Sequence, residues 1–93
     1  MEKNEIKERV IKILSDIFQE VDADIIEYAD LIDDLGMDSM TYVTVLIETE
    51  TDFNIEVPDE ALLMENFRNS DLITDILDRV INIQSTSEME AGG

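Results

Sequence analysis

The stretch DDLGMDSMTYV, residues 33–43, marks a boundary: an acidic segment passes through one glycine, reaches a serine, and then becomes apolar. Asp and Ser are favoured immediately before a helix, so Asp38 or Ser39 supplies the N-cap. The sequence therefore predicts a helix over residues 39–52. Its main apolar stripe is expected to contain Met40, Val43, Leu46 and Ile47, with Phe53 as an extension and Val45 off the stripe.

A β-strand is the competing interpretation of this segment. MTYVTVLIETET, residues 40–51, is rich in β-branched residues, which favour strands. The apolar run continues past the usual strand length, and no segment nearby offers a clear partner strand. We therefore prefer a helix, held by tertiary packing because its threonines are weak helix formers.

Apolar residues at helical spacing predict three further helices. The first covers residues 3–21, the third covers residues 58–66 with Pro58 at its start, and the fourth is capped by Asn69 or Ser70. The buried stripe of the first is expected to contain Ile6, Val10, Ile13, Leu14, Ile17 and Val21. That of the fourth is expected to contain Leu72, Ile73, Ile76, Leu77, Val80 and Ile81.

A long acidic loop is predicted over residues 22–38, since Asp favours turns and caps over helix interiors. Its apolar residues should pack back onto the helices, with a short turn of helix near Ile25 to Tyr28. The predicted fold class is all-α: a small four-helix bundle with a long first loop and a short third helix. Residues 1–84 form one domain, and residues 85–93 are expected to be a flexible tail.

The formal charge of −18 on 93 residues excludes some classes of partner. Such a surface repels nucleic acid and anionic membranes, and it attracts proteins with basic patches. The chain has no cysteine, so it forms no disulfide and no thiolate metal site. No apolar run reaches membrane-spanning length and no signal peptide is visible, so we expect a cytoplasmic monomer without membrane insertion.

Two kinds of site can be weighed on residues alone. Asp22 and Asp24 begin a calcium-loop spacing, but Ile26 and Glu27 stand where an oxygen ligand and a glycine are needed. A metal site is therefore rejected. Ser39 lacks the usual histidine base, because the chain contains none, and no motif supports a Ser–Lys pair. We predict no catalytic residues, and on this ground alone Ser39 is a helix cap.

The order of residues around Ser39 resembles the attachment motif of acyl carrier proteins. That motif reads roughly Asp-x-Leu-Gly-x-Asp-Ser-Leu at a helix start, and Met40 here replaces the usual leucine. ETETDFNIEVPDEAL, residues 48–62, and NFRNSDLITDIL, residues 66–77, are similar to the family's later segments. The resemblance covers roughly residues 3–82, and it implies that residues 1–84 are an acyl carrier domain.

The resemblance implies a function that residue chemistry alone does not. In the family, a phosphopantetheinyl transferase moves 4′-phosphopantetheine from coenzyme A onto this serine, which would be Ser39. Asp38 would support the motif, and the arm would hold acyl groups as thioesters for fatty-acid, polyketide or related biosynthesis. The chain would then be a non-catalytic carrier. Aminoacyl or peptidyl carriers, and an unmodified acidic interaction module, are the alternatives.

The resemblance also implies that the helix after Ser39 docks partner enzymes with basic patches: acyl-loading, condensing and tailoring enzymes. The fatty-acid type carries acids two and five positions after the serine, where this chain has Thr41 and Thr44. This departure favours a specialised pathway. Val43 is assigned more readily to the core than to docking. The candidate docking residues are Met40, Val43, Ile47, Glu48 and Glu50.

Overall fold

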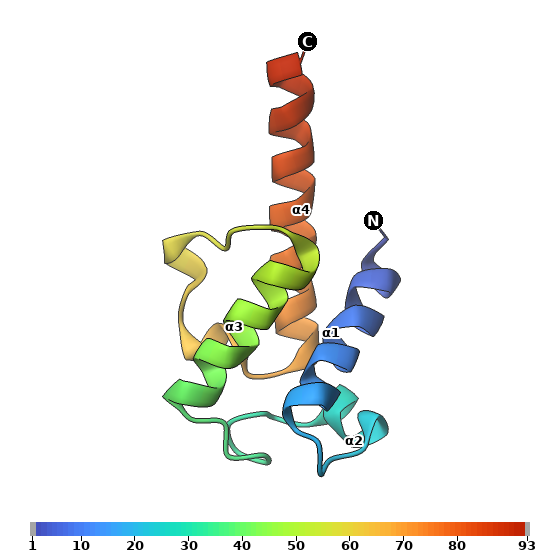
Figure 1. Ribbon diagram of the computed structural model, residues 1–93, viewed down its shortest axis with the longest axis vertical. Coiled ribbons are helices and arrows are strands. Elements are labelled where there is room, and N and C mark those ends of the chain that lie inside the picture. The colour runs from blue at the N-terminus through green and yellow to red at the C-terminus, as the bar shows by residue number, and fades with distance from the viewer. Residues whose placement is uncertain (1, 93) are drawn as a thin grey trace.

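The computed structural model describes the backbone of residues 2–92 and the side chains of residues 2–83. The described chain contains helices and turns but no strand, and so confirms the all-α class and the helix after Ser39 (Figure 1). Two short 3₁₀ helices, η1 and η2, stand between the last two α-helices. The elements are α1 Lys3–Ile17, α2 Ala23–Tyr28, α3 Ser39–Phe53, η1 Asp59–Ala61, η2 Met64–Phe67 and α4 Ser70–Gly92.

Helix α1 contacts each of the other α-helices, α2, α3 and α4. Ile6, Val10 and Leu14 recur at four-residue spacing and are almost completely buried, as the sequence predicts. The helix ends at Ile17, four residues earlier than predicted. The backbone leaves the helical conformation at Phe18, and the backbone of Asp22 is extended where it precedes α2. Helix α1 therefore cannot continue through Val21.

Basic side chains of α1 tie it to its neighbours. Lys3 pairs with Asp75 of α4, and Lys7 lies 3.1 Å from Asp71 of α4 and 3.5 Å from Glu27 of α2. The pKa values of both lysines are raised, chiefly by hydrogen bonds to Asp75 and Asp71 respectively. These pairs place the positive charge of the N-terminal segment against the acidic α2 and α4.

The predicted third helix over residues 58–66 is instead the pair η1 and η2. The helix is interrupted because the backbone of Leu63 is extended, with φ −116° and ψ 135°. After this break Phe67 is fully buried, and its ring packs edge-on against Tyr42 of α3, with 5.5 Å between ring centroids. Burial of this aromatic ring favours the interruption over a continuous helix.

Helix α4 is capped by Asn69, whose Oδ1 accepts a hydrogen bond from the Leu72 backbone N–H at 2.8 Å. Ser70, the other candidate, is buried and donates its hydroxyl to the Glu27 carbonyl oxygen at 2.9 Å. The backbone of α4 is helical to Gly92. Helical geometry does not measure motion, so a flexible tail over residues 85–93 stays a prediction; the side chains of that segment lie outside the described residues.

Candidate functional site

Ser39 is the first residue of α3, and its side chain is exposed. Helix α3 begins in the lower part of the view in Figure 1. Asp38 precedes it in an extended conformation, and its Oδ1 accepts a hydrogen bond from the Thr41 backbone N–H at 2.9 Å. This N–H is the main reason that the pKa of the Asp38 carboxyl lies below its usual value. Asp38 is therefore the cap, and the Ser39 side chain is not used as one.

Buried side chains anchor the loop on both sides of its acidic turn. Leu31 is fully buried and Met37 is 3% exposed, and the Met37 backbone N–H donates to the Leu31 carbonyl oxygen at 2.8 Å. Gly36 has φ +68°, a conformation that residues with a side chain rarely adopt. A Cβ would meet no atom there within 4 Å, so backbone conformation is what the glycine provides.

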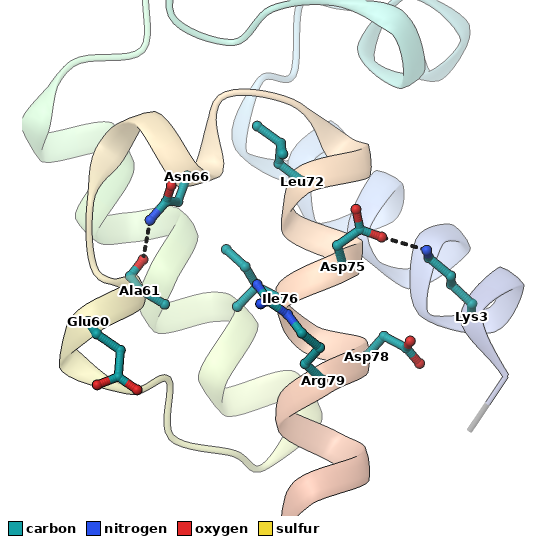
Figure 2. A pocket seen from close by; sticks show the side chains of 9 residues that line it. All are labelled: Lys3, Glu60, Ala61, Asn66, Leu72, Asp75, Ile76, Asp78 and Arg79. Carbon is teal, nitrogen blue, oxygen red and sulfur yellow. Dashed lines mark hydrogen bonds and ion pairs between the residues drawn. The ribbon is translucent and has the colours of Figure 1, made fainter.

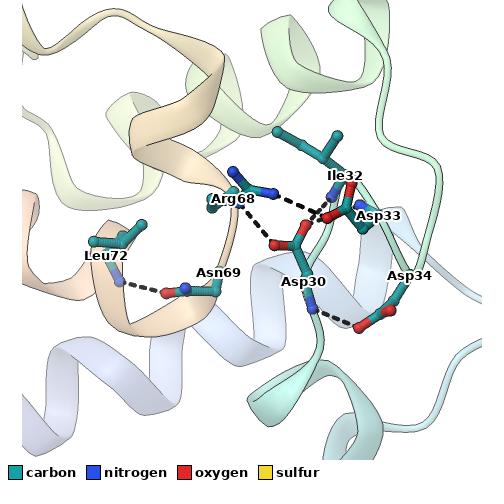
Figure 3. A network of polar contacts seen from close by, with 7 residues as sticks. All are labelled: Asp30, Ile32, Asp33, Asp34, Arg68, Asn69 and Leu72. Atoms are coloured by element: carbon teal, nitrogen blue, oxygen red, sulfur yellow. Dashed lines mark hydrogen bonds and ion pairs between the residues drawn. The ribbon is translucent and has the colours of Figure 1, made fainter.

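Asp30 organises the acidic turn, as Figure 3 shows. Its Oδ1 accepts hydrogen bonds from the backbone N–H groups of Ile32 and Asp33, at 3.0 and 2.8 Å. Its own N–H donates to Asp34 Oδ2 at 2.9 Å. The Asp33 N–H, followed by the Arg68 guanidinium, holds the pKa of the Asp30 carboxyl below its usual value. The loop is therefore an ordered turn built on one ionised carboxylate.

Arg68 reaches this turn from the segment before α4. Its Nε donates to Asp30 Oδ2 at 2.7 Å and its Nη2 donates to Asp33 Oδ2 at 3.1 Å. Its carbonyl oxygen accepts from the Leu31 N–H at 2.6 Å. Sequence analysis missed this contact. The available signal was that only two basic residues, Arg68 and Arg79, follow position 12 in a chain of charge −18.

Helix α3 presents a different face to the core from the predicted one. Val45 and Thr49 are buried, whereas Met40, Val43 and Ile47 are 81%, 47% and 54% exposed. The predicted stripe was therefore wrong in placing these three inside and Val45 off it, and Val43 is not a core residue. Apolar residues surround the helix on several sides, so periodicity could not select the face. Half-buried residues that complete the inner face are Tyr42, Leu46 and Phe53.

The two acids proposed for docking lie in different surroundings. Glu50 is half-buried, and its Oε2 accepts a hydrogen bond from the Val57 N–H at 2.9 Å, so it closes the turn after α3. Glu48 is exposed and lines an open groove between α1 and α3 that also contains Lys12. Of the two carboxylates, Glu48 is the one turned toward solvent.

A second open groove, of about 620 Å³, lies between α4 and residues 60–66 (Figure 2). Its apolar floor includes Leu72 and Ile76. Arg79 lies beside the floor, and the Lys3–Asp75 ion pair borders one side. The groove is thus an open surface feature lined by both charged and apolar side chains, and we assign it no role. In the part of the chain with described side chains, no group of three or more acidic residues is arranged to hold a metal ion.

Comparison with known proteins decides the family. The family model described as "Phosphopantetheine attachment site" matches residues 8–69, about two thirds of the chain. An acyl carrier protein of Caulobacter vibrioides is 43% identical over 61 residues, which span 62% of this chain and 74% of the relative. One from Phenylobacterium zucineum is 41% identical over 61 residues, which span 62% of this chain and 73% of that relative. The chain belongs to the acyl carrier protein family.

Membership gives the cofactor of this acyl carrier protein as 4′-phosphopantetheine. The chain offers what such a group needs, namely an exposed hydroxyl at a helix start with an anchored loop before it. Membership of this family agrees with the prediction that the chain is a carrier protein. Within the described residues, no helix has the length and apolar character required to span a bilayer.

Proposed function

We propose that Ser39 is the attachment point of 4′-phosphopantetheine, and that the chain holds acyl groups as thioesters on this arm. A phosphopantetheinyl transferase would move the group from coenzyme A onto the Ser39 hydroxyl. The observation that carries the proposal is the exposure of Ser39 at the first position of α3, directly after the Asp38 cap.

The electrostatics of the helix start suit a phosphodiester at this position. A helix N-terminus carries partial positive charge and free N–H groups, which favour a bound phosphate. Asp38 already takes the Thr41 N–H, so it holds the helix start in place beside the modified residue. The thiol that carries the acyl group comes with the cofactor, so a cysteine-free chain is sufficient for this role.

The surface of α3 supports a specialised pathway, polyketide-like or another dedicated synthesis, over general fatty-acid synthesis. Residues 39–47 contain no charged side chain, and Thr44 donates its hydroxyl to the Met40 carbonyl oxygen at 3.2 Å. Partner enzymes would contact the exposed Met40, Val43 and Ile47, with Glu48 at the far end of this uncharged surface. Loading, condensing and tailoring enzymes in the cytoplasm are the expected partners.

Intact mass tests the attachment. The apo protein is incubated with coenzyme A, magnesium and a broad-specificity phosphopantetheinyl transferase, beside Ser39→Ala as the matched control. We expect wild type alone to gain the mass of one phosphopantetheine. The contrary result is no gain in mass for folded wild type while a control carrier is modified in the same assay. If the protein purified from its native host is also unmodified, the chain is an unmodified interaction module and not a carrier.

Elongation assays test the pathway. A generic fatty-acid synthase should extend acyl chains on this carrier much more slowly than on the main carrier of the same organism, because Thr41 and Thr44 stand where the fatty-acid type has acids after the serine. Equal rates for the two holo carriers would contradict a specialised role and leave the attachment at Ser39 unaffected.

A further inference from the structure

Arg68 is the one described side chain outside the acidic loop that hydrogen-bonds to carboxylates of its turn. It hydrogen-bonds to Asp30, which is 38 positions earlier in the sequence, and to Asp33, which is 35 positions earlier. Figure 3 shows these two side-chain contacts. The Arg68 carbonyl oxygen also accepts the Leu31 N–H, so side chain and main chain hold the same turn from one position. Arg68 itself is fixed by the burial of its neighbour Phe67.

We propose that Arg68 is a positioning residue for modification: through Asp30 and Asp33 it holds the loop that presents Ser39 to the phosphopantetheinyl transferase. This inference rests on the proposed function of Ser39. Four residues separate Asp33 from Asp38, and one of them is the buried Met37, so the turn fixes where the loop joins α3. A loop already in its bound geometry saves the transferase the cost of ordering it.

Charge explains why an arginine suits this position. Asp30, Asp33 and Asp34 lie within five residues, and their mutual repulsion favours opening of the turn. The guanidinium offers several N–H donors in one plane and reaches two carboxylates at once. A lysine ammonium is a single compact charge, so it would replace only part of the contact.

Burial explains why loss of Arg68 should affect the loop more than the fold. The side chains of Arg68, Asp30 and Asp33 are 36%, 28% and 70% exposed, so truncation of Arg68 opens no core cavity. Asp30 would keep its hydrogen bonds from two backbone N–H groups and remain partly in contact with water. The substitution does not alter the buried side chains of Leu31 and Met37 themselves. The expected consequence is local opening of the turn in a folded protein.

The test compares Arg68→Gln, Arg68→Lys and the control Arg79→Gln. Arg79 is exposed, lies beside the α4 groove, and loses the same charge on substitution (Figure 2). For transfer to Ser39, we expect Arg68→Gln to lower kcat/KM about tenfold, Arg68→Lys to recover part of the loss, and Arg79→Gln to stay within about twofold of wild type. The melting temperature of Arg68→Gln should stay close to that of the control.

Amide hydrogen exchange supplies a readout that does not depend on the transferase. The Leu31 and Met37 N–H groups should exchange faster in Arg68→Gln than in Arg79→Gln, with α1 unchanged. Asp33→Asn should slow transfer in wild type and add little in Arg68→Gln, because the contact is already absent. Wild-type transfer rates in Arg68→Gln, or unchanged exchange at both amides, would overturn the inference. Failure of wild type itself to accept the arm would instead overturn the proposed function.

Discussion

Helices α1 and α3 are equal in length, fifteen residues each, yet they use their apolar side chains in opposite ways. Helix α1 buries Ile6, Val10 and Leu14 against the other helices. Helix α3 exposes Met40 and Ile47, and it places the polar Thr49 in the core, one of its two fully buried residues.

The difference separates two uses of hydrophobic residues. An apolar side chain that packs in the core stabilises the fold, whereas one left in water gains nothing until something covers it. The exposed residues of α3 follow Ser39 directly along the helix, so a partner that reaches the serine also meets them. This comparison suggests that α1 stabilises the bundle and that α3 presents a surface for binding.

The largest expected effect comes from the core of α1. Leu14→Ala should lower the free energy of unfolding by about 2–5 kcal/mol, because it removes a buried side chain and leaves a cavity. Ile47→Ala on α3 should cost less than about 1 kcal/mol. Urea denaturation measures both. Similar losses in the two variants would contradict the division between the helices.

Two valines of α3 form a matched pair that separates its faces. Val45→Ala should lower the free energy of unfolding by roughly 1–3 kcal/mol, since Val45 is fully buried. Val43→Ala, two positions away, should change it by less than about 0.5 kcal/mol. The chemical change is the same in both, so urea midpoints compare burial alone. A greater loss of stability from Val43→Ala than from Val45→Ala would mean that the buried face is the one that the sequence predicts.

Docking gives the next largest effect and tests whether the exposed face has a use. Ile47→Asp should raise the KM for transfer of phosphopantetheine by about tenfold, because the substitution charges an apolar contact. Ile83→Asp on α4, where Ile83 is 64% exposed, is the control for charge and exposure. If the two folded variants had equal KM values, Ile47 would not be part of the surface that contacts the transferase.

Sequence reasoning succeeded where apolar residues repeat with one period and polar residues fill the remaining positions, as in α1. It found the start of α3 because a cap is local chemistry that Asp38 carries itself. It failed on the buried face of α3, where Val45 on one side and Val43 and Ile47 on another offer similar hydrophobicity. Such a face is chosen by the partners across the core, and those are distant in sequence.

The same distinction applies to the loops. The break at Leu63 and the contact of Arg68 with Asp30 both depend on tertiary structure, through burial of Phe67 and a contact across 38 residues. No local pattern encodes either feature. The exposed position of Ser39, by contrast, follows from a motif whose glycine and aspartate act on adjacent backbone.

Salt should raise the melting temperature by a few degrees, because screening reduces repulsion in a chain of charge −18. The effect should arise at the acidic surface, since the apolar core of α1 carries no charge. Scanning calorimetry from low to moderate sodium chloride measures it. A melting temperature that falls or stays constant would mean that surface ion pairs, such as Lys7 with Asp71, outweigh the repulsion.

The smallest effect is expected from acid, and it bears on the loop before α3. The pKa of Asp30 is lowered in the folded protein, so its ionised form stabilises the fold above its ordinary pKa of about 3.9. This contribution is lost as pH falls through the lower, folded pKa. Asp30→Asn should therefore be less stable than wild type at pH 7, and the difference should shrink below about pH 4.

Urea denaturation across this range, with Asp16→Asn on the exposed side of α1 as the control for net charge, makes the comparison. If the loop owes its order to ionised Asp30, the difference in free energy of unfolding between wild type and Asp30→Asn narrows in acid. The corresponding difference for the control Asp16→Asn should not narrow in the same way. Equal stability of wild type and Asp30→Asn at pH 7 would instead mean that the turn is held by Leu31 and Met37 alone. The loop before Ser39 would then depend on apolar burial, as α1 does.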